Sequence, residues 1–524
     1  MRRVVNFRYI FILAVSLILM TLFLYEILPS FSIRFAFCVC LIVVTILLAL
    51  LLFYLKKKII IIILSIFIFG SFLSVNGLIR ENYQNKITSF NNKNVIITGK
   101  ITSNFSYTKS ENIKIIIDDV KIFSEDNYLK LNKKYYLYIE PSNLNTNDLK
   151  LGSYVETNAI INMYDFNKDN KSQISNDIAG YSFCYSNDFV VKEKFNLNLR
   201  EKIVDFVYKK LIKFDLRTAG IGLAMIFGNV DFIEKDTVTA FQNIGVAHLL
   251  AVSGLNVSII ISIFMFICKK LRFSLKSQFI VNLVILPIYM YLCNFSPSVV
   301  RAGLMAIILL YAKMRGKPYD RLNALSLVSC LMILINPLYV YNYSFILSFA
   351  STFAIIMLYL KFKLFFGKYF YNYFADELSL NLSIQVSLIF IQLYLFGYLP
   401  FLSILSNLFI IPLVSISFII LLIGFVISLI PIFSFGLIIY DFLMNIVVEL
   451  GYFINSLGSI ITIPNIAFIS VLLYFVFIFV ISDYFFEKRN NKIFIVINLI
   501  FICFIAQTLI IMWFDARQKI WILL

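Results

Sequence analysis

The sequence predicts a polytopic α-helical membrane protein of about 12 spans, with one inserted small β domain outside the membrane. The chain of 524 residues is 60% hydrophobic and 14% charged, whereas a soluble globular chain is about 45–50% apolar and about 25% charged. Several apolar runs reach about 20 residues, the length that crosses a bilayer as a helix. These runs are continuous rather than alternating, which excludes a transmembrane β-barrel.

The net charge of +17 has two explanations: basic residues set the orientation in the membrane, or they attract anions. Segment 80–199 carries 15 basic and 14 acidic residues, so the basic excess lies in the apolar portion and its short loops. Lys and Arg collected in short cytoplasmic loops set the orientation of a membrane protein. The charge therefore indicates topology first and anion attraction second.

Residues 1–79 read as an N-terminal region of about three spans. Basic residues precede the first run and close the second, and they predict that the N-terminus is cytoplasmic. The first run is long and lacks a small-residue cleavage pattern, so it is not a cleaved signal peptide. The predicted spans are near 9–28, 35–55 and 59–79, and the basic residues are Arg2, Arg3, Arg8 and Lys56 to Lys58.

Residues 80–196 change character and predict an extracytoplasmic β domain. Short runs rich in Ile, Val and Tyr alternate with turn-forming Asn, Asp, Gly and Ser. About five such strands suit a small barrel or sandwich, and an OB-like barrel is the expected form. OB-like barrels bind single-stranded nucleic acid through aromatic and basic residues. The near-neutral balance leaves a structural or assembly role equally open. The runs are 95–101, 114–117, 134–139 and 154–160.

Residues 197–240 are expected to form amphipathic or interfacial helices. Apolar residues recur at helical spacing over 197–215, with Arg200, Lys202 and other basic residues between them. Such a helix lies at a membrane surface or packs on the outer domain. The apolar stretch 218–229 is too short to span and reads as re-entrant or interfacial.

Residues 241–514 are expected to form the main transmembrane domain. Basic loops recur at 269–276, 313–321, 361–368 and 487–492, and they fit in/out alternation. The predicted spans lie near 249–268, 278–294, 298–314, 322–336, 344–360, 380–398, 401–430, 432–456, 466–484 and 493–513, the segment 401–430 being long enough for two pieces around Pro412.

Residues 241–261 contain His248, the one histidine of the chain, within a run that otherwise reads as a membrane helix. On a continuous helix His248 and Asn256 would share one broad face. Gly254 and Ser258 begin a small-residue seam that favours close helix packing. Ser253 and Gly254 could instead break the helix, as at transport sites. An intramembrane ionisable residue is a functional candidate, although a histidine bonded within the bundle is an equal reading.

Three further polar clusters fall at helix ends on the outer side of this topology. Arg301 follows a Ser-Pro helix start, Ser348 lies in a Ser-rich turn after Asn336-Pro337, and Asn407 precedes Pro412. Snorkelling to headgroups is the alternative explanation of Arg301. We expect these clusters to converge with His248 on one outer entrance.

Several activities are disfavoured by what the sequence lacks. One histidine rules out a multi-His metal centre, and there is no Walker A loop and no GxSxG elbow. The seven cysteines form no CxxC pattern, and most lie in apolar runs as small hydrophobic residues. We therefore expect neither an enzyme nor a bound cofactor or metal. A membrane enzyme using His248 as a base would need a carboxylate such as Asp441 or Glu449.

Residues 245–257 resemble the core motif of the ComEC family of DNA-uptake channels, G-x-x-H-L-L-A-x-S-G-L-H-V. Asn256 occupies the position of the second histidine of that motif. Asn229 occupies the position of the aspartate in a short Leu-Leu-Gly-Asp-type segment that precedes the motif. Segments 298–302, 344–351 and 407–412 are similar to later family motifs. Many relatives add a C-terminal metallo-β-lactamase-like domain, and this chain shows no such motif.

The resemblance implies an inner-membrane channel that passes single-stranded DNA into the cytoplasm during natural transformation. The channel-lining or DNA-contact candidates are His248, Ser253, Gly254, Asn256, Ser258, Arg301, Ser348 and Asn407. The implied partners are single-stranded DNA, the lipid bilayer, a cytoplasmic DNA translocase ATPase, an extracytoplasmic DNA receptor and a separate nuclease, and a homo-oligomer is compatible with this role. The alternative is a secondary transporter or exporter of another anionic solute.

Overall fold

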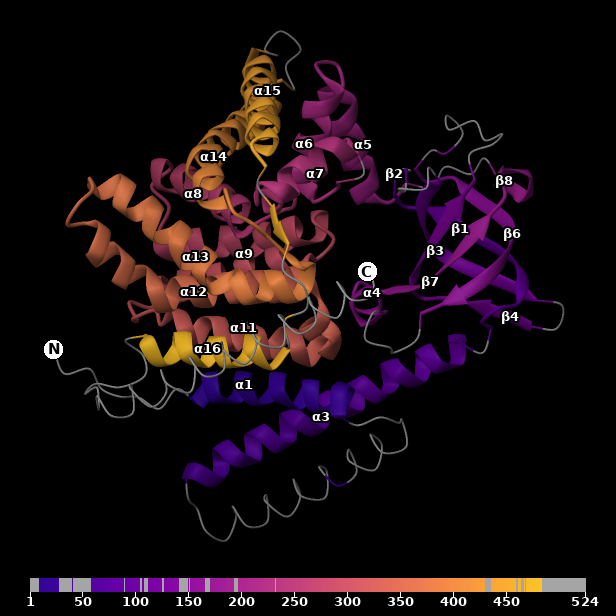
Figure 1. Cartoon of the computed structure of the whole chain (residues 1–524), viewed down its shortest axis with the longest axis horizontal. Coiled ribbons are helices and arrows are strands. Elements are labelled where there is room, and N and C mark those ends of the chain that lie inside the picture. The colour runs from indigo at the N-terminus through magenta and orange to yellow at the C-terminus, as the bar shows by residue number, and fades with distance from the viewer. Residues whose placement is uncertain are drawn as a thin grey trace, which may run out of the picture.

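A computed structural model gives the arrangement of a helical body and a β barrel (Figure 1). It describes residues 9–27, 40, 58–88, 90–103, 106–107, 112–124, 127–140, 149, 151–164, 170–192, 197–230, 232–428, 435–458, 460–462, 466 and 468–482. The predicted spans near 35–55 and 493–513, the basic loop at 487–492, and Arg2, Arg3, Arg8, Lys56 and Lys57 lie outside these residues.

Five strands of the β domain close into a barrel in the order β1-β3-β5-β7-β6, and β6 pairs again with β1. The pair β5–β7 is parallel, and the other barrel pairs are antiparallel. The strands are β1 (Asn94–Ile101), β3 (Ile113–Ser124), β5 (Lys134–Ile139), β6 (Tyr154–Met163) and β7 (Ile178–Cys184), with β2 (Ser106–Tyr107), β4 (Asn127–Lys130) and β8 (Phe189–Lys192) beside them.

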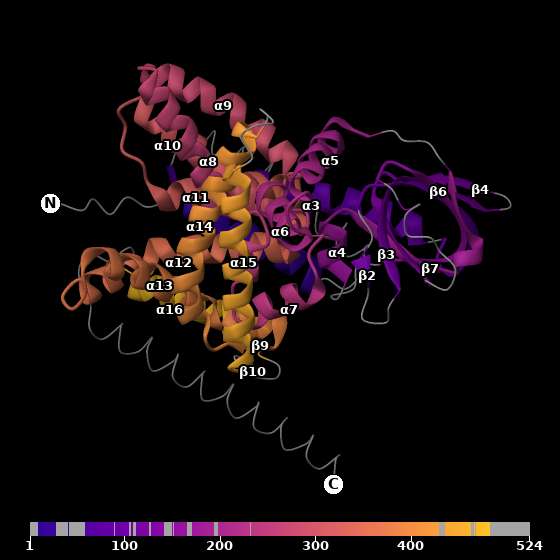
Figure 2. The same ribbon diagram turned by 90° about the horizontal axis from the view of Figure 1, so that it is seen from above.

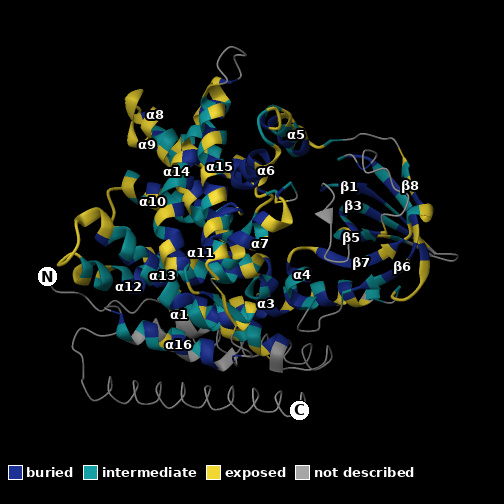
Figure 3. Ribbon diagram, turned by 45° about the horizontal axis from the view of Figure 1, so that its top comes forward, coloured by how far each residue is buried: buried dark blue, intermediate teal, exposed yellow. Residues whose placement is uncertain are grey.

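Alternating burial explains why this segment forms a barrel. Every second residue of β6 is buried, from Val155 to Met163, and the residues between them face outward. Ile97, Ile115 and Leu137 fill the interior from three other strands. In Figure 3 the strands of the barrel carry mostly buried and intermediate positions, with exposed ones between them. The predicted small β domain is confirmed.

The helical body contains most of the chain. Its elements are α1 (Tyr9–Leu22), η1 (Phe23–Ile27), α3 (Lys58–Thr88), α5 (Leu199–Leu211), α6 (Leu216–Phe227), α7 (Lys235–Asn243), η5 (Ala247–Leu249), α8 (Gly254–Lys270), α9 (Leu275–Leu292), α10 (Pro297–Met314), α11 (Arg321–Ile335), η6 (Pro337–Tyr341), α12 (Tyr343–Phe366), α13 (Asn372–Phe396), β9 (Tyr398–Pro400), α14 (Ser403–Ile427), α15 (Phe435–Ser456), β10 (Ile460–Thr462) and α16 (Phe468–Ile481).

Six helices within the described residues are long and apolar enough to cross a membrane: α9, α10, α12, α13, α14 and α15. This confirms a multi-pass helical membrane protein, and the total of about 12 spans stays a prediction. Helix α14 runs without interruption through Pro412. The helices are not all parallel. In Figure 1, α14 and α15 run across the direction of α1 and α16.

The turns of the helical body fall into two groups at opposite ends. The α9–α10 turn lies beside α5 and the barrel, since Arg200 Nε donates to Leu292 O at 2.8 Å. The turn from α11 to α12 also faces the barrel, because Asn342 Nδ2 bonds Asn176 Oδ1 at 2.8 Å beside α4 (Lys171–Ser175). Helices of about 18 residues are about 27 Å long. The α8–α9, α10–α11 and α12–α13 turns therefore lie far from the barrel (Figure 2).

The two ends differ sharply in charge. The turns 293–296 and 336–342 at the barrel end carry no charged residue. At the far end, segments 269–276 and 313–321 carry eight basic residues and one acid, Asp320, whose carboxylate caps α11. The predicted separation of basic loops from the β domain is thus present in the fold.

A buried ion pair joins the barrel to the helical body. Lys100 Nζ of β1 lies 2.7 Å from Glu201 Oε2 of α5, and the two side chains are only 8% and 7% exposed. Glu201 also accepts from the backbone N–H of Asn198 at 2.8 Å, which completes the capping box of α5. The Glu201 carboxylate therefore does two things: it binds Lys100 of the barrel, and it caps its own helix.

Removing the Glu201 carboxylate should destabilise the protein strongly. Glu201→Gln leaves the Lys100 ammonium buried without its counter-charge, and breaking a buried pair in this way costs about 3–5 kcal/mol. The matched control is Glu156→Gln, which breaks the more exposed pair with Lys192 and should cost less than about 1 kcal/mol. Thermal unfolding of the purified chain measures both, and equal losses would contradict the assignment.

Lys133 lies where α3 meets the barrel and should make stability depend on pH. Burial lowers the pKa of Lys133 from 10.5 to about 8, nearby Asp177 opposes this shift, and Arg80 adds to it. Between about pH 8 and about pH 10.5 the unfolded chain binds more protons at this position, so stability rises with pH there.

Lys133→Gln should remove this rise. The difference in unfolding temperature between wild type and variant should therefore change in favour of the wild type as the pH rises from about 8 to about 10.5. Lys130→Gln is the control, because the Lys130 side chain is 53% exposed. A wild-type advantage that stays constant across this range would refute the role of Lys133.

Candidate functional site

The motif residues 245–257 form an interruption between two helices. Helix α7 ends at Asn243, a short 3-10 turn covers Ala247–Leu249, and α8 begins at Gly254 after an extended Ser253. A continuous helix from residue 249, one of the two predicted forms, is therefore wrong, and the break at Ser253 and Gly254 is confirmed. His248 does not lie on α8, so it shares no helix face with Asn256.

Gly245 shows why the chain turns here. Its φ of +79° is a left-handed conformation that favours glycine. A Cβ on Gly245 would also lie 2.6 Å from Ser403 Cβ and 2.9 Å from Pro400 Cγ. The interruption is thus pressed against the start of α14 and cannot continue as a helix with an ordinary side chain.

Asn256 is buried and satisfies the end of another helix. Its Nδ2 donates to Met225 O of α6 at 2.8 Å, and its Oδ1 accepts from Ser253 Oγ at 3.2 Å. Only 4% of Asn256 is exposed. The residue therefore acts first as a structural bridge between α6 and α8, and not as an open wall residue as predicted.

Helix α6 ends inside the helical body and needs such donors. It is buried from Thr218 to Phe227 and stops at Gly228, whose φ is +76°. Ile226 O accepts from Tyr289 OH at 3.0 Å and from Cys293 Sγ at 3.5 Å. The carbonyl end of a short buried helix is thus satisfied by side chains from α8 and α9.

Arg301 joins three helices at what we call the Arg301 junction, formed by Gly254, Ser298, Arg301 and Ser348. Arg301 Nη1 donates to Ser348 O at 2.8 Å, and Ser348 Oγ donates to Ser298 Oγ at 3.3 Å. A Cβ on Gly254 would lie 2.7 Å from Arg301 Nη2. A larger residue at position 254 would therefore displace the guanidinium from the start of α8.

The guanidinium of Arg301 is buried, with 9% of the residue exposed. Snorkelling to the membrane surface, the alternative explanation from the sequence, is therefore wrong. Arg301 Nε has no hydrogen-bond partner among the described residues. A buried guanidinium donor left free is costly, so this group has unused capacity for an acceptor.

His248 is exposed, unlike Asn256 and Arg301. Its ring is therefore accessible on the segment between α7 and α8, whereas Asn256 and Arg301 are covered by protein.

The remaining candidates divide into two kinds. Ser258 is exposed and bonds the carbonyl of Gly254 in its own helix. Asn407 is 4% exposed, and its Oδ1 has no partner among the described residues. The structure therefore joins Ser253 to Asn256, and Gly254 to Arg301 and Ser348. Among the described residues no side-chain hydrogen bond joins His248 or Asn407 to either group.

Sequence reasoning missed the roles of Tyr289 and Cys293. The available signal was Gly228 after a short apolar run, because a glycine there ends a helix and leaves carbonyls that need donors. No group of three or more His, Cys, Asp or Glu within the described ranges is arranged to hold a metal ion.

A family model described as Competence protein matches residues 225–486, which is half of the chain. ComE operon protein 3 of Bacillus subtilis is 32% identical over 149 residues, covering 28% of this chain and 19% of that protein. Recombination protein 2 of Haemophilus influenzae is 25% identical over 137 residues, covering 25% of this chain and 17% of that protein. The chain thus matches less than a fifth of the length of these curated relatives. No solved structure matches.

Asn256→Asp should destabilise the protein more than Asn256→Ala. A carboxylate cannot donate to Met225 O, and it adds a buried charge, whereas alanine only leaves the carbonyl without its donor at a cost of about 1–3 kcal/mol. Ser258→Ala is the control on the same helix and should change stability by less than about 0.5 kcal/mol. Thermal unfolding in detergent gives the order, and a more stable Asp variant would contradict the bridge.

Proposed function

Because the chain belongs to the competence protein family, we propose that it passes one strand of DNA across the cytoplasmic membrane during natural transformation. The chain acts as a channel and carries out no catalytic step of its own. The observation that carries this proposal is that the matched region, from Met225 onward, contains the helix interruption with Asn256 and Arg301. Natural competence delivers single-stranded DNA, so the cargo is a polyanion.

The interruption suits conduction better than anchoring. Non-helical backbone at membrane depth is tolerated where it is buried in protein or lines a water-filled cavity. The segment from Gly245 to Ser253 is such backbone, and it lies between the buried end of α6 and the start of α8. His248 on this segment is accessible, and an imidazole lacks the permanent charge of Lys or Arg, so it would hold a phosphate only weakly. Conduction needs weak sites of this kind.

Arg301 has the chemistry to bind phosphate but is covered in this conformation. Its guanidinium is held by Ser348 O and lies against Gly254. Contact with DNA therefore requires that α8 moves away from α10 and α12. We assign the Arg301 junction as the gate: phosphate oxygens compete for the guanidinium and replace the carbonyl of Ser348.

The charge of the two ends sets the orientation. The basic far-end turns lie in the cytoplasm, so the barrel and residues 80–196 lie outside, and the N-terminus is cytoplasmic. An extracytoplasmic DNA receptor and a nuclease act on the barrel side. A translocase ATPase acts at the basic end and supplies the energy. About 12 spans and a homo-oligomeric state are compatible with this arrangement.

The barrel is OB-like in its connections. Counting only its five closing strands along the chain, their order around the barrel is 1-2-3-5-4, and strands 3 and 5 are the parallel pair. This is a five-stranded Greek-key barrel of the kind that binds oligonucleotides and oligosaccharides.

Replacing Arg301 should block DNA transfer without affecting DNA capture. In a competent host, Arg301→Ala should lower the labelled DNA that reaches the cytoplasm by roughly tenfold or more, because the one buried cation of the junction is lost. Arg301→Lys should keep part of the activity, since it retains charge but not the planar fork. Surface-bound DNA should stay unchanged in both variants.

Arg315→Ala, at the exposed end of the same helix, is the matched control and should transfer DNA normally. Membrane levels of each variant are compared by immunoblot. Normal transfer by Arg301→Ala at normal protein level would contradict the gate. A deletion strain that transforms normally but loses uptake or export of a small anion would favour a secondary transporter instead, a class that also uses helices interrupted at the binding site.

A further inference from the structure

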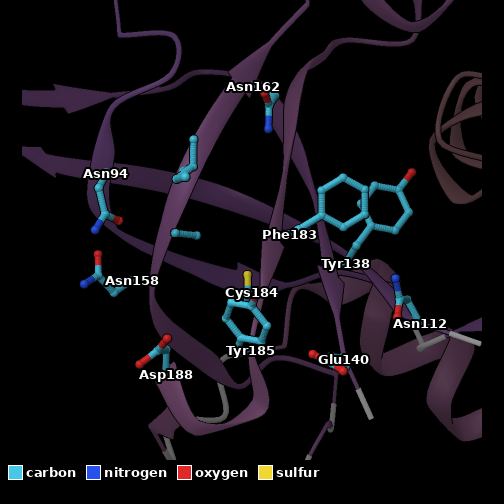
Figure 4. Close-up of a pocket in the computed structure, with 12 residues that line it drawn as sticks. Asn94, Asn112, Tyr138, Glu140, Asn158, Asn162, Phe183, Cys184, Tyr185 and Asp188 are labelled. Atoms are coloured by element: carbon cyan, nitrogen blue, oxygen red, sulfur yellow. The ribbon is translucent and has the colours of Figure 1, made fainter. Parts of the chain in front are cut away.

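The outer face of the barrel carries a cavity of about 640 Å³ that the DNA channel does not explain (Figure 4). Its volume lies within the range of small-molecule sites, about 300–1,000 Å³. Only barrel residues line it, so it does not depend on the helical body. The lining comes from β1, β5, β6, β7 and the turns beside them: Asn94, Asn112, Tyr138, Glu140, Asn158, Ala159, Ile160, Asn162, Phe183, Cys184, Tyr185 and Asp188.

Aromatic rings form one side of this cavity. The rings of Tyr138 and Phe183 stack with centroids 5.2 Å apart and planes 28° apart, and Tyr181 meets both edge-on. Phe183 is 57% exposed and Tyr185 is 69% exposed. Exposed rings beside a cavity are surfaces that a ligand can cover with a gain from apolar burial.

Amides and carboxylates lie around these rings (Figure 4). Four asparagines project into the cavity, and none of their side chains bonds another described residue: Asn94, Asn112, Asn158 and Asn162. Glu140 and Asp188 add two carboxylates, and none of the described residues that line the cavity is Lys or Arg. Lys114 lies beside this face, with its ammonium 3.9 Å from the centre of the Tyr136 ring and 5.9 Å from that of Tyr138.

This charge pattern decides between two ligand classes that such barrels bind. A nucleic acid strand needs cations along its phosphates, and two carboxylates that have no ion-pair partner among the described residues repel it. A neutral sugar chain needs flat apolar surface for its ring faces and amide or carboxylate groups for its hydroxyls. We propose that this cavity binds an uncharged carbohydrate chain, with Tyr138 and Phe183 against the sugar rings and Asn158, Glu140 and Asp188 bonding the hydroxyls.

Binding here is non-covalent. Cys184 lies at the floor of the cavity, and burial raises the pKa of its thiol to about 11. The thiol is therefore protonated at neutral pH and is a poor nucleophile. Burial also raises the pKa of Tyr138, so its hydroxyl stays a neutral hydrogen-bond donor.

The proposed orientation, which rests on the proposed function, places this cavity outside the membrane. Glycan chains of the cell envelope are present there, and DNA has to pass them before it reaches the channel. A barrel that holds such a chain would fix the channel to the envelope. The carbohydrate site itself is independent of orientation, and it is tested by binding alone.

The test uses the purified full chain in detergent, with tetra-N-acetylchitotetraose as a neutral sugar probe and a twelve-nucleotide oligothymidine as the nucleic acid probe. Saturable binding of the sugar is expected by calorimetry. Phe183→Ala should weaken it by roughly tenfold, since one stacking surface is removed. Phe123→Ala is the matched control, because Phe123 is an exposed aromatic residue, 41% accessible, that does not line the cavity.

The double variant Glu140→Gln/Asp188→Asn separates the two ligand classes by the sign of its effect. It should weaken binding of the sugar, because charged acceptors are lost, and it should not weaken binding of the oligonucleotide. Thermal unfolding confirms that each variant is folded. Absence of sugar binding by the folded wild type overturns the proposal. So does oligonucleotide binding at this cavity that Phe183→Ala abolishes. Neither outcome affects the DNA-transfer test of Arg301.

Discussion

The helical body depends on one constraint. Where a helix ends inside the body, away from water, its last backbone groups still need hydrogen-bond partners. Helix α6 is only 12 residues long and is buried from Thr218 to Phe227, so its last carbonyls lie away from water. Asn256, Tyr289 and Cys293 supply the missing donors. The interruption before α8 is therefore possible only because side chains from α8 and α9 complete the end of α6.

Arg301 is buried without a carboxylate partner among the described residues, and a backbone carbonyl takes that place. Its charge is held by the carbonyl of Ser348 and by close approach to Gly254, where a larger residue would collide. A carboxylate partner would neutralise the guanidinium permanently. A carbonyl partner leaves the charge unpaired, so an incoming anion can compete for it. Structural burial and a role toward phosphate are compatible for this reason.

The sequence predicted the parts of the fold that follow from local pattern. Continuous apolar runs located α9, α10 and α12 to α15, and short runs rich in Ile, Val and Tyr between turn-forming residues located β1 and β6, because each pattern depends on one element alone. The burial of Asn256 and Arg301 could not be predicted in this way. The burial of Asn256 depends on α6, and that of Arg301 depends on Gly254 and Ser348. These partners are distant in the sequence from the side chains they cover. The sequence placed His248 on the same helix as Asn256 because the apolar run continues through Ser253. The residue pattern does not reveal the extended backbone at Ser253.

The distribution of charge suits a polyanion that must not be trapped. The turns at 293–296 and 336–342 on the barrel side are uncharged, and the barrel cavity contains two carboxylates, so these parts would hold a DNA strand only weakly. Within the helical body Arg301 is covered, and the proposed gate requires that α8 moves. Among the described turns between helices, basic residues are dense in 269–276 and 313–321 at the far end. A strand would thus gain electrostatic stabilisation as it advances, which favours one direction of passage even though the chain itself supplies no energy.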